Sequence, residues 1–354
     1  MSKAAELAAL IGSGQAQGNR NLIINGAMNV AQRGTSFSFA HDGTRNTYTV
    51  DRFAFSMRST SDEYDCTVAQ VSDGPAGFSS SLKLTTGTAE SAVGSDEYYV
   101  IYQPIEAQNL QSLQYGTSGA QTITISFYVK SSRTGTFGFS IYKPDNTERV
   151  IAKTYTINSA NTWEKKSITM AGDTSIAIDD DNGGGMYVYW LMAAGTLFNS
   201  GASTTEWANY GSGTTWFQAS ATNDIVTTAG ATWQITGVQL EIGEVATPFE
   251  HGDFGTTFNK CRRYYQKLGG SSYYGGFHAW TSFTGVYIQL VPPMRAAPTV
   301  TQYAVRNGSS GATANANANY ISVDGFNAPI DGSGGADTNG SHINQGTMEA
   351  AAEL

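Results

Sequence analysis

Apolar and polar residues alternate along most of the chain after residue 20. Residues 122–130 carry apolar side chains at every second position, and residues 137–141 repeat this pattern after a glycine-containing turn. A period of two is typical of half-buried antiparallel strands. Similar runs predict strands over residues 48–57, 81–84, 98–104, 152–155, 163–170, 186–193 and 233–242. Short strands at regular spacing, separated by Gly, Asn and Asp, predict a two-sheet β-sandwich of the jelly-roll kind.

The first residues follow a different period. Residues 2–11 predict one short amphipathic helix, with Leu7, Leu10 and Ile11 on its apolar stripe. The Gly- and Gln-containing stretch that follows predicts a flexible tether. A helix this short is not stable by itself, so we expect residues 1–20 to be an anchor that docks on another surface. A frayed terminus is the alternative interpretation.

The strand pattern also stops near residue 250. Residues 258–267 have helical rather than strand character and predict a hinge helix within a linker at residues 251–270. Beyond it, strand-like segments alternate with proline-rich turns and Gly-rich loops. The sequence therefore predicts an all-β chain: an N-terminal anchor helix and tether (1–20), a jelly-roll domain (21–250), the linker (251–270) and a smaller β-rich domain (271–354).

Composition agrees with this organisation. The 354 residues are enough for two hydrophobic cores, and 14% charged against 40% hydrophobic residues excludes a disordered chain or a coiled coil. The 40 Gly and 12% aromatic residues suit many strands joined by tight turns. Cys66 and Cys261 stand far apart, outside any metal-binding or disulfide pattern, so we expect two reduced structural thiols.

Charge and hydropathy limit the kinds of partner that the protein is expected to bind. The net charge of −9 repels phosphate backbones, which disfavours a nucleic-acid partner. No apolar run is long enough to span a bilayer, so membrane insertion is not expected. The chain contains no Gly-x-Ser-x-Gly, His-Glu-x-x-His, phosphate-loop or dinucleotide-binding motif, and its four histidines are scattered singly. We therefore expect a protein that is not an enzyme.

The densest acidic run is a candidate metal site. Asp179 and Asp181 stand in a run of three aspartates followed by Asn and three Gly, and such oxygen ligands on a bendable loop suit Ca²⁺. The run lacks the alternating ligands and the distal Glu of an EF-hand loop. A turn with solvated acids is therefore the favoured interpretation, and no other cofactor is expected.

Aromatic residues form the candidate sugar site. Trp207, Tyr210 and Trp216 lie in or beside a Gly-rich loop, and flat rings with neighbouring Asn, Ser and Thr suit sugar rings and their hydroxyls. In the alternative interpretation Trp207 and Trp216 plug the ends of the sandwich, while Trp190 belongs to the core. A second aromatic stretch, with Tyr274 and Trp280, is the competing candidate for sugar binding, and packing between copies of the chain is its alternative interpretation.

Several stretches together resemble one known class of module. Residues 21–34 (NLIINGAMNVAQRG) and 48–53 (YTVDRF) resemble the opening of modules found in bacteriophage tail fibres and related virion proteins. Residues 103–106, 126–131, 160–164 and 172–174 resemble the interior of such a module, and residues 235–250 and 261–266 resemble its C-terminal end. The resemblance covers about residues 19–301, the greater part of the chain.

The resemblance implies a jelly roll similar to carbohydrate-binding modules. It also implies a virion appendage, made in the cytoplasm of a bacterial host, that attaches to polysaccharide on the host surface, commonly as a homotrimer. Leu7, Leu10 and Ile11 would then anchor the chain to other virion proteins. No catalytic residues carry over.

The sequence departs from long tail fibres in one respect. Those fibres usually begin with a sizeable adaptor domain, whereas here the module begins after about twenty residues. A short tail or collar fibre, or a head fibre or capsid decoration protein, therefore remains open. The rival function is a glycan depolymerase, which usually needs an elongated repeat scaffold and a groove of acids.

Overall fold

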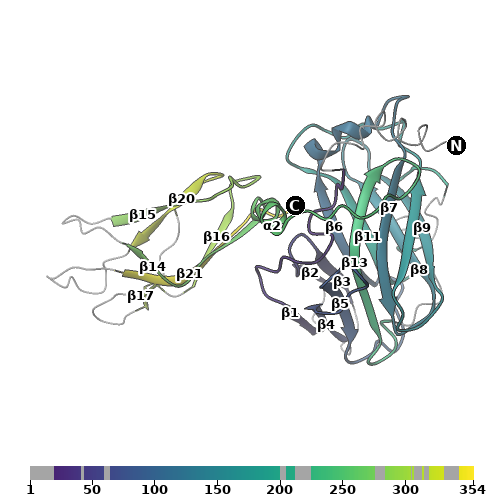
Figure 1. Cartoon of the computed structure of the whole chain (residues 1–354), viewed down its shortest axis with the longest axis horizontal. Helices are drawn as coiled ribbons and strands as arrows, with labels where there is room; N and C mark the ends of the chain where they lie inside the picture. Colours follow the sequence, from purple (N-terminus) through teal and green to yellow (C-terminus); the bar gives the residue numbers. More distant parts are fainter. Residues whose placement is uncertain are drawn as a thin grey trace. The chain divides into compact units, whose positions relative to one another are not determined.

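The chain folds into two compact units that meet in sequence at Phe254 and Gly255. A computed structural model describes residues 20–40, 44–59, 64–199, 205–211, 225–275, 284–303, 305–306, 313–314, 319–330 and 343–354 (Figure 1). Leu7, Leu10 and Ile11 of the predicted anchor lie outside these residues. Within them, no helix is long and apolar enough to cross a membrane.

The first unit is a sandwich of two antiparallel sheets, which confirms the predicted all-β jelly roll. The six-stranded sheet has the order β1 (Ser36–Ala40), β4 (Asp65–Val71), β5 (Ser81–Thr86), β13 (Thr232–Ile242), β7 (Ile123–Ser131) and β10 (Glu164–Met170). The seven-stranded sheet has the order β12 (Ala208–Asn209), β9 (Arg149–Ile157), β8 (Gly135–Lys143), β11 (Gly184–Ala194), β6 (Tyr98–Glu106), β3 (Ala54–Arg58) and β2 (Thr44–Tyr48). The chain crosses between the sheets repeatedly, and a 3-10 helix, η1 (Ala107–Leu113), follows β6.

One predicted strand is wrong in its extent. Residues 48–57 form the end of β2 and most of β3, and a tight turn separates the two strands. In that turn the Thr49 amide donates to the Phe53 carbonyl at 2.8 Å, and Arg52 has a φ of 71°. The turn itself carries two buried apolar side chains, Val50 and Phe53, so the hydrophobic pattern did not mark it as a turn.

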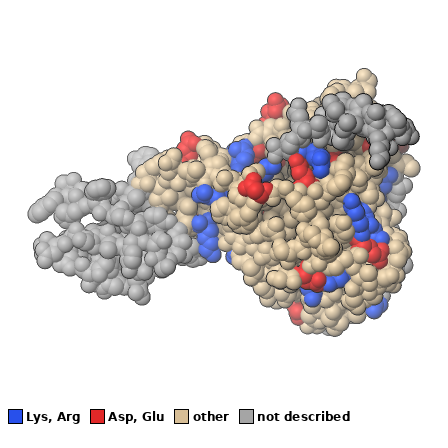
Figure 2. Space-filling view, viewed as in Figure 1, with Lys and Arg blue, Asp and Glu red and all other residues tan. Residues whose placement is uncertain are grey.

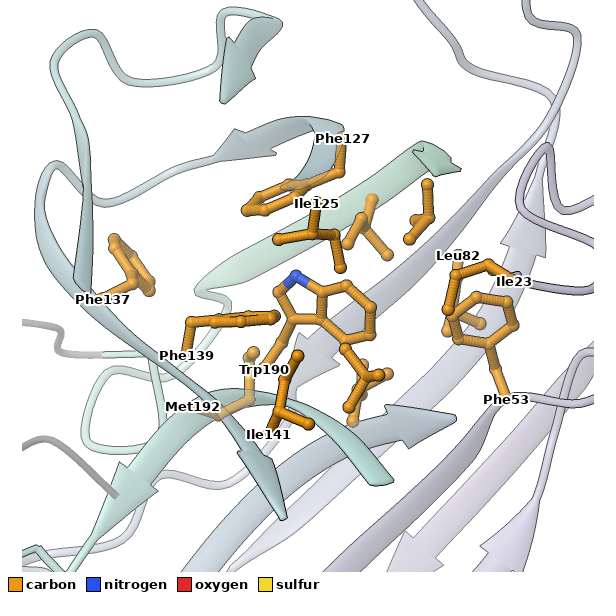
Figure 3. Close-up of a cluster of buried hydrophobic side chains, with 14 of the residues drawn as sticks. Ile23, Phe53, Leu82, Ile125, Phe127, Phe137, Phe139, Ile141, Trp190 and Met192 are labelled. Carbon is orange, nitrogen blue, oxygen red and sulfur yellow. The ribbon is translucent and has the colours of Figure 1, made fainter. Parts of the chain in front are cut away.

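Trp190 lies at the centre of the hydrophobic core between the sheets (Figure 3). Its ring centroid is 5.7 Å from that of Phe139, 5.9 Å from Phe127 and 6.2 Å from Phe53. The indole lies edge-on to Phe127, an arrangement that aromatic rings prefer. The interpretation of Trp190 as a core residue is confirmed.

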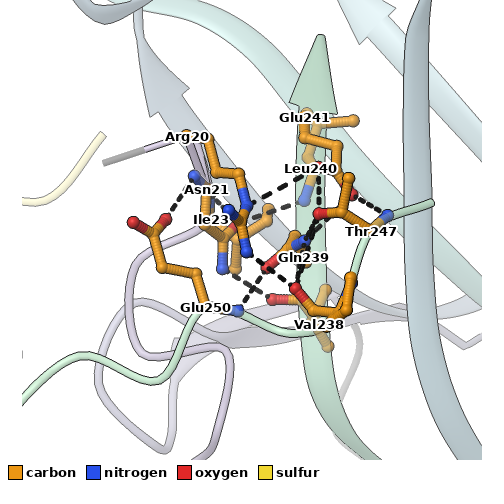
Figure 4. Close-up of polar contacts among 10 residues, drawn as sticks. Arg20, Asn21, Ile23, Val238, Gln239, Leu240, Glu241, Thr247 and Glu250 are labelled. Carbon is orange, nitrogen blue, oxygen red and sulfur yellow. Dashed lines mark hydrogen bonds and ion pairs between the residues drawn. The ribbon is translucent and has the colours of Figure 1, made fainter. Parts of the chain in front are cut away.

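The chain enters and leaves the sandwich at one place (Figure 4). The Arg20 guanidinium donates to the Pro248 carbonyl at 2.8 Å, and the Asn21 amide donates to the Glu250 carboxylate at 3.0 Å. Glu241, which is fully buried on β13, lies 3.8 Å from the Arg20 Nε atom. We call this set, with Gln239 and Thr247, the terminal clamp. Its residues come from or adjoin the segments that resemble the opening and close of the phage module.

The second unit begins with α2 (Phe254–Arg262). One of its sheets has the order β14 (Tyr265–Gly275), β21 (Ile343–Ala351) and β16 (Thr299–Tyr303). Another has the order β15 (Thr284–Gln289), β20 (Gly325–Ile330) and β19 (Asn319–Ser322). The short strands β17 (Val305–Arg306) and β18 (Thr313–Ala314) pair with each other. Among the described residues of this unit, those that form its buried apolar cluster are Ile288, Leu290, Met294, Phe326, Met348, Ala350 and Ala352.

The predicted hinge helix is wrong at its C-terminal end. Helix α2 ends at Arg262, and residues 265–267 belong to β14. Tyr264 and Tyr265 are both buried, and Tyr265 pairs with Ala351 of β21, so strand pairing replaces the helix there. From Gly255 onward the helix is part of the second unit rather than a separate linker.

Candidate functional site

The outer face of the seven-stranded sheet carries a row of tyrosines. Along β11 every second side chain, including Trp190, packs into the core, so Tyr187 and Tyr189 point to the opposite face. On β6, Tyr98 and Tyr102 also join the cluster on that outer face. We call this surface the tyrosine face: Tyr48, Tyr98, Tyr102, Tyr142, Tyr187, Tyr189, Tyr210 and Phe198.

The rings of the tyrosine face form a continuous series. The centroid of Tyr142 lies 5.9 Å from Tyr210 and 6.0 Å from Tyr187. Tyr187 in turn lies 6.1 Å from Tyr102, and 6.3 Å from Tyr189 with the ring planes within 14°. Strand register produces this series, because Tyr187 pairs with Tyr142 of β8 and Tyr189 pairs with Tyr102 of β6. Aromatic groups from four separate segments thus meet on one surface.

Exposure differs along the series. Tyr98, Tyr142, Tyr187 and Tyr210 are partly exposed, whereas Tyr102 and Tyr189 are buried. Tyr98, Tyr142 and Tyr187 therefore rest against a buried layer that includes Tyr102 and Tyr189, which limits their rotamers. Rings held in this way lose little conformational entropy when a flat ligand stacks on them.

A second aromatic contact lies at the β6 end of this face. The rings of Tyr98 and Phe198 meet edge to face at 5.2 Å. The Arg58 guanidinium lies 6.0 Å from the Phe198 ring and 3.0 Å from the Asp96 carboxylate. This end thus combines aromatic rings with an exposed ion pair.

Polar groups accompany the rings. The Tyr142 hydroxyl donates to the exposed Glu148 carboxylate at 2.6 Å, and the Tyr102 hydroxyl donates to the exposed Asn46 side chain at 2.8 Å. Burial raises the pKa of Tyr142, and its hydrogen bond to Glu148 raises it further. Burial likewise raises the pKa of Tyr189 well above its usual value. These phenols therefore remain neutral at physiological pH and keep their hydroxyl protons for hydrogen bonding.

This combination suits a neutral, ring-shaped ligand. Tyrosine rings offer flat apolar surfaces, while amide and carboxylate oxygens accept hydrogen bonds from hydroxyl groups. Charged residues make up only 14% of the chain, and in the view of Figure 2 Lys and Arg are interspersed with Asp and Glu. Sugars have both apolar ring faces and hydroxyls, so the tyrosine face is chemically suited to them.

The structure corrects the prediction for Trp207. This side chain is only 6% exposed, its ring contacts Tyr115 at 5.7 Å, and its Nε1 donates to the Ala171 carbonyl at 2.9 Å. A buried indole has no free face for a sugar, so Trp207 fills the sandwich, as the alternative interpretation held. Its neighbour Tyr210 does lie on the tyrosine face.

The other candidate aromatics have no described side chains. Trp216 and Trp280 lie outside the described residues, and Tyr274 belongs to β14 of the second unit, where its side chain is not described. Sequence reasoning did not select Tyr142 or Tyr102. The available signal was the alternation of Tyr187 and Tyr189 with core residues on β11.

The acidic run forms a hydrogen-bonded turn. Asp181 accepts from the Gly183 amide at 2.8 Å, and Asp179 accepts from the Asn146 side chain at 3.0 Å. The Asp179 amide in turn donates to Asp145, whose pKa is raised by burial and by the neighbouring charges of Asp179 and Asp181. Among the described residues, no three His, Cys, Asp or Glu side chains gather in a metal-binding arrangement. The predicted Ca²⁺ ligands Asp179 and Asp181 thus serve here as turn acceptors.

Both cysteines are buried, and neither forms a disulfide. Burial raises the pKa of the Cys66 thiol to about 12. A thiol in this state is a poor nucleophile and metal ligand. Cys66 therefore offers no reactive group to a site.

Comparison with known proteins gives only distant likenesses. No family model matches the chain, and no curated protein matches it. Among solved structures, the enzymatically active domain of bacteriophage CBA120 tailspike protein 4 is 12% identical, with a TM-score of 0.32 over 63% of this chain and 22% of that chain. The match thus spans about a fifth of the tailspike's length.

Two sugar-binding proteins are similar at the same level. A putative sugar binding protein from Bacteroides thetaiotaomicron is 14% identical, with a TM-score of 0.34 over 63% of this chain and 100% of that chain. A family 11 carbohydrate-binding module from Clostridium thermocellum, in complex with a mixed-linked β-1,3-1,4 tetrasaccharide, is 11% identical, with a TM-score of 0.28 over 59% and 100%. Likenesses at these scores carry no argument about function, which therefore has to rest on the residues of this chain.

Proposed function

We propose that the sandwich binds polysaccharide through its tyrosine face, without cleaving it. The observation that carries this proposal is the ring series Tyr210, Tyr142, Tyr187 and Tyr102, whose successive centroids are 5.9, 6.0 and 6.1 Å apart. Its three partly exposed members, Tyr210, Tyr142 and Tyr187, offer neighbouring stacking positions to one glycan chain, and the buried Tyr102 packs beside Tyr187. The carboxylate and amide beside it accept hydrogen bonds from sugar hydroxyls.

We further propose that the protein is a virion appendage, a short tail or collar fibre, with a head fibre as the alternative. The support is the resemblance of residues 21–34 and 235–250 to phage modules. Several copies on one particle would combine weak sugar contacts into strong attachment.

A homotrimer belongs to this proposal. In the second unit the Tyr287 side chain is 58% exposed, and Val291 and Ile321 are also exposed large apolar residues. Exposed apolar residues of this size favour association between copies. Light scattering at micromolar concentration should give three times 37.6 kDa, and a persistent monomer would contradict the trimer.

The binding proposal is tested by native gel electrophoresis through soluble polysaccharides. The probes are mixed-linkage β-glucan, xylan, dextran and bacterial lipopolysaccharide, each compared with a gel that contains none. We expect at least one of them to retard the wild-type protein. Normal migration in all four gels would count against the binding function.

The same polysaccharides separate binding from cleavage. After overnight incubation with the protein, we expect no increase in reducing ends. An increase that depends on protein concentration would instead establish the depolymerase alternative.

A further inference from the structure

A buried ion cluster lies beside the Tyr210 end of the tyrosine face. The Lys143 ammonium is 2.8 Å from the Asp173 carboxylate, and Arg149 reaches the same carboxylate with Nε at 3.3 Å. The side chains of Lys143 and Asp173 are 0% and 1% exposed, and that of Arg149 is 12% exposed. Two cations therefore share one buried anion.

The surplus positive charge of this cluster has further partners. The Lys143 ammonium lies 5.1 Å from the Tyr115 ring and 5.4 Å from the Trp207 ring, and it donates to the Ile176 carbonyl at 2.6 Å. Ring faces and a carbonyl oxygen both attract a cation. Trp207 thus completes the shell around Lys143, which explains why it is buried.

Ionisation of the cluster follows from these contacts. Burial alone would raise the pKa of Asp173, but hydrogen bonds from Lys143, the Ser175 amide and Arg149 outweigh this and lower it. Burial lowers the pKa of Lys143, and its hydrogen bond to Asp173 opposes that change. Asp173 therefore stays ionised at neutral pH and can hold Arg149 in place.

Arg149 uses its remaining donors on the chain around β12. Nη1 donates to the Asn209 side chain at 2.6 Å, and Nη2 donates to the Trp207 carbonyl at 2.8 Å. Strand β12 is only two residues long and pairs with β9 at Val150 and Arg149. So short a strand has few ladder hydrogen bonds of its own. Side-chain bonds from Arg149 therefore hold it as well.

We propose that Arg149 is a positioning residue for the tyrosine face. Held by Asp173, which Lys143 holds in turn, Arg149 fixes residues 207–210 so that Asn209 and Tyr210 stand at the end of the ring series. The Tyr210 amide, which donates to the Glu148 carbonyl at 2.8 Å, completes this attachment. The binding part of the inference rests on the proposed function.

The planar guanidinium is essential to this role. It can contact Asp173, Asn209 and the Trp207 carbonyl at once, because its five donors form a rigid fork. A lysine at position 149 keeps the charge that faces Asp173 but has a single nitrogen. Arg149→Lys therefore tests the attachment of residues 207–210 while it keeps a positive charge beside Asp173.

The first measurement needs no ligand. In hydrogen–deuterium exchange of the full chain, Arg149→Lys should speed exchange in peptides covering residues 205–211 at least threefold, while the melting temperature changes by only a few degrees. Asn209→Ala, which removes one Arg149 bond and leaves the ion cluster intact, should act in the same direction. Arg58→Lys, at the opposite end of the face, is the matched control and should leave these peptides unchanged. Unchanged exchange in both Arg149→Lys and Asn209→Ala would overturn the positioning role.

The second measurement links positioning to binding. In gels containing whichever of the four polysaccharides retards the wild type, Arg149→Lys should weaken affinity about fivefold, and Tyr210→Ala should weaken it to a similar extent. The double variant should be no weaker than Tyr210→Ala, because Arg149 acts through Tyr210. Additive losses would overturn that coupling. If no polysaccharide retards the wild type, the binding proposal fails, and the exchange result still decides whether Arg149 fixes residues 207–210.

Discussion

The two outer faces of the sandwich use the same strand alternation for different purposes. On the six-stranded sheet, β13 directs Gln239 and Glu241 outward, where they bond to Thr247 and Glu250 of the same chain. On the seven-stranded sheet, outward positions carry partly exposed tyrosines. The first face satisfies its polar groups internally and serves stability. The second leaves ring surface accessible and is the face through which we propose that the protein binds polysaccharide.

The difference does not lie in aromatic content. On the six-stranded side, Phe78 lies 5.4 Å from Tyr128 and 5.0 Å from Phe249, ring to ring. These rings pack over Gly237, whose φ is 61° and where a Cβ atom would lie 2.7 Å from Phe78. Trp163 is likewise engaged, with the Lys130 ammonium 5.1 Å from its ring. Aromatic residues there hold loops against the sheet, whereas on the tyrosine face they form a continuous series.

The largest expected effect is on the stability of the six-stranded face. Glu241→Ala removes a fully buried carboxylate and leaves the Thr247 amide and hydroxyl without their acceptor. We expect the free energy of unfolding to fall by about 3 kcal/mol, measured by urea denaturation. Glu148→Ala, on the tyrosine face, is the control and should cost less than about 1 kcal/mol because Glu148 is exposed. Equal losses of unfolding free energy in the two variants would contradict a stabilising role specific to the six-stranded face.

The faces should also respond to opposite extremes of pH. The folded pKa of Tyr142 is raised, so its contribution to stability is complete below about pH 10 and is lost as the pH rises further. The pKa of Asp73, on the six-stranded side, is lowered chiefly by its hydrogen bond from Lys130. Its contribution is present above about pH 4 and is lost as the pH falls through the folded pKa.

Thermal melts across pH test this pair of shifts. Tyr142→Phe should reduce the loss of stability at alkaline pH and leave the stability at acid pH unchanged. Asp73→Asn should reduce the loss of stability at acid pH and leave the stability at alkaline pH unchanged. If Tyr142→Phe changed the stability at acid pH, or Asp73→Asn changed it at alkaline pH, the assignment of these groups would be wrong.

The smallest effect is expected when a ring is retained. Tyr187→Phe removes one hydroxyl but keeps the surface on which a sugar stacks. Its affinity for the retarding polysaccharide should stay within about twofold of the wild type, measured by migration against polysaccharide concentration. A loss as large as that from Tyr187→Ala would show that the hydroxyl, rather than the ring face, carries binding.

Local alternation was enough to predict the sandwich but not its surface. Residues 122–130 alternate cleanly and form β7, because a period of two reflects burial of one face. The tyrosine face depends instead on register between distant strands, such as Tyr189 of β11 against Tyr102 of β6. Trp207 was misassigned for a related reason: its partners Tyr115 and Lys143 lie more than sixty residues away in sequence. Pairings of this kind are set by the fold rather than by neighbouring residues.

The most direct test of the central claim compares one tyrosine on each face. Tyr187 and Tyr128 are both partly exposed, and each packs against other aromatic rings. In gels containing the polysaccharide that retards the wild type, Tyr187→Ala should weaken affinity about tenfold, which corresponds to about 1.4 kcal/mol. Tyr128→Ala should bind as the wild type does, with a comparable change in melting temperature. Equal affinity of the two variants, or a loss confined to Tyr128→Ala, would contradict binding through the tyrosine face.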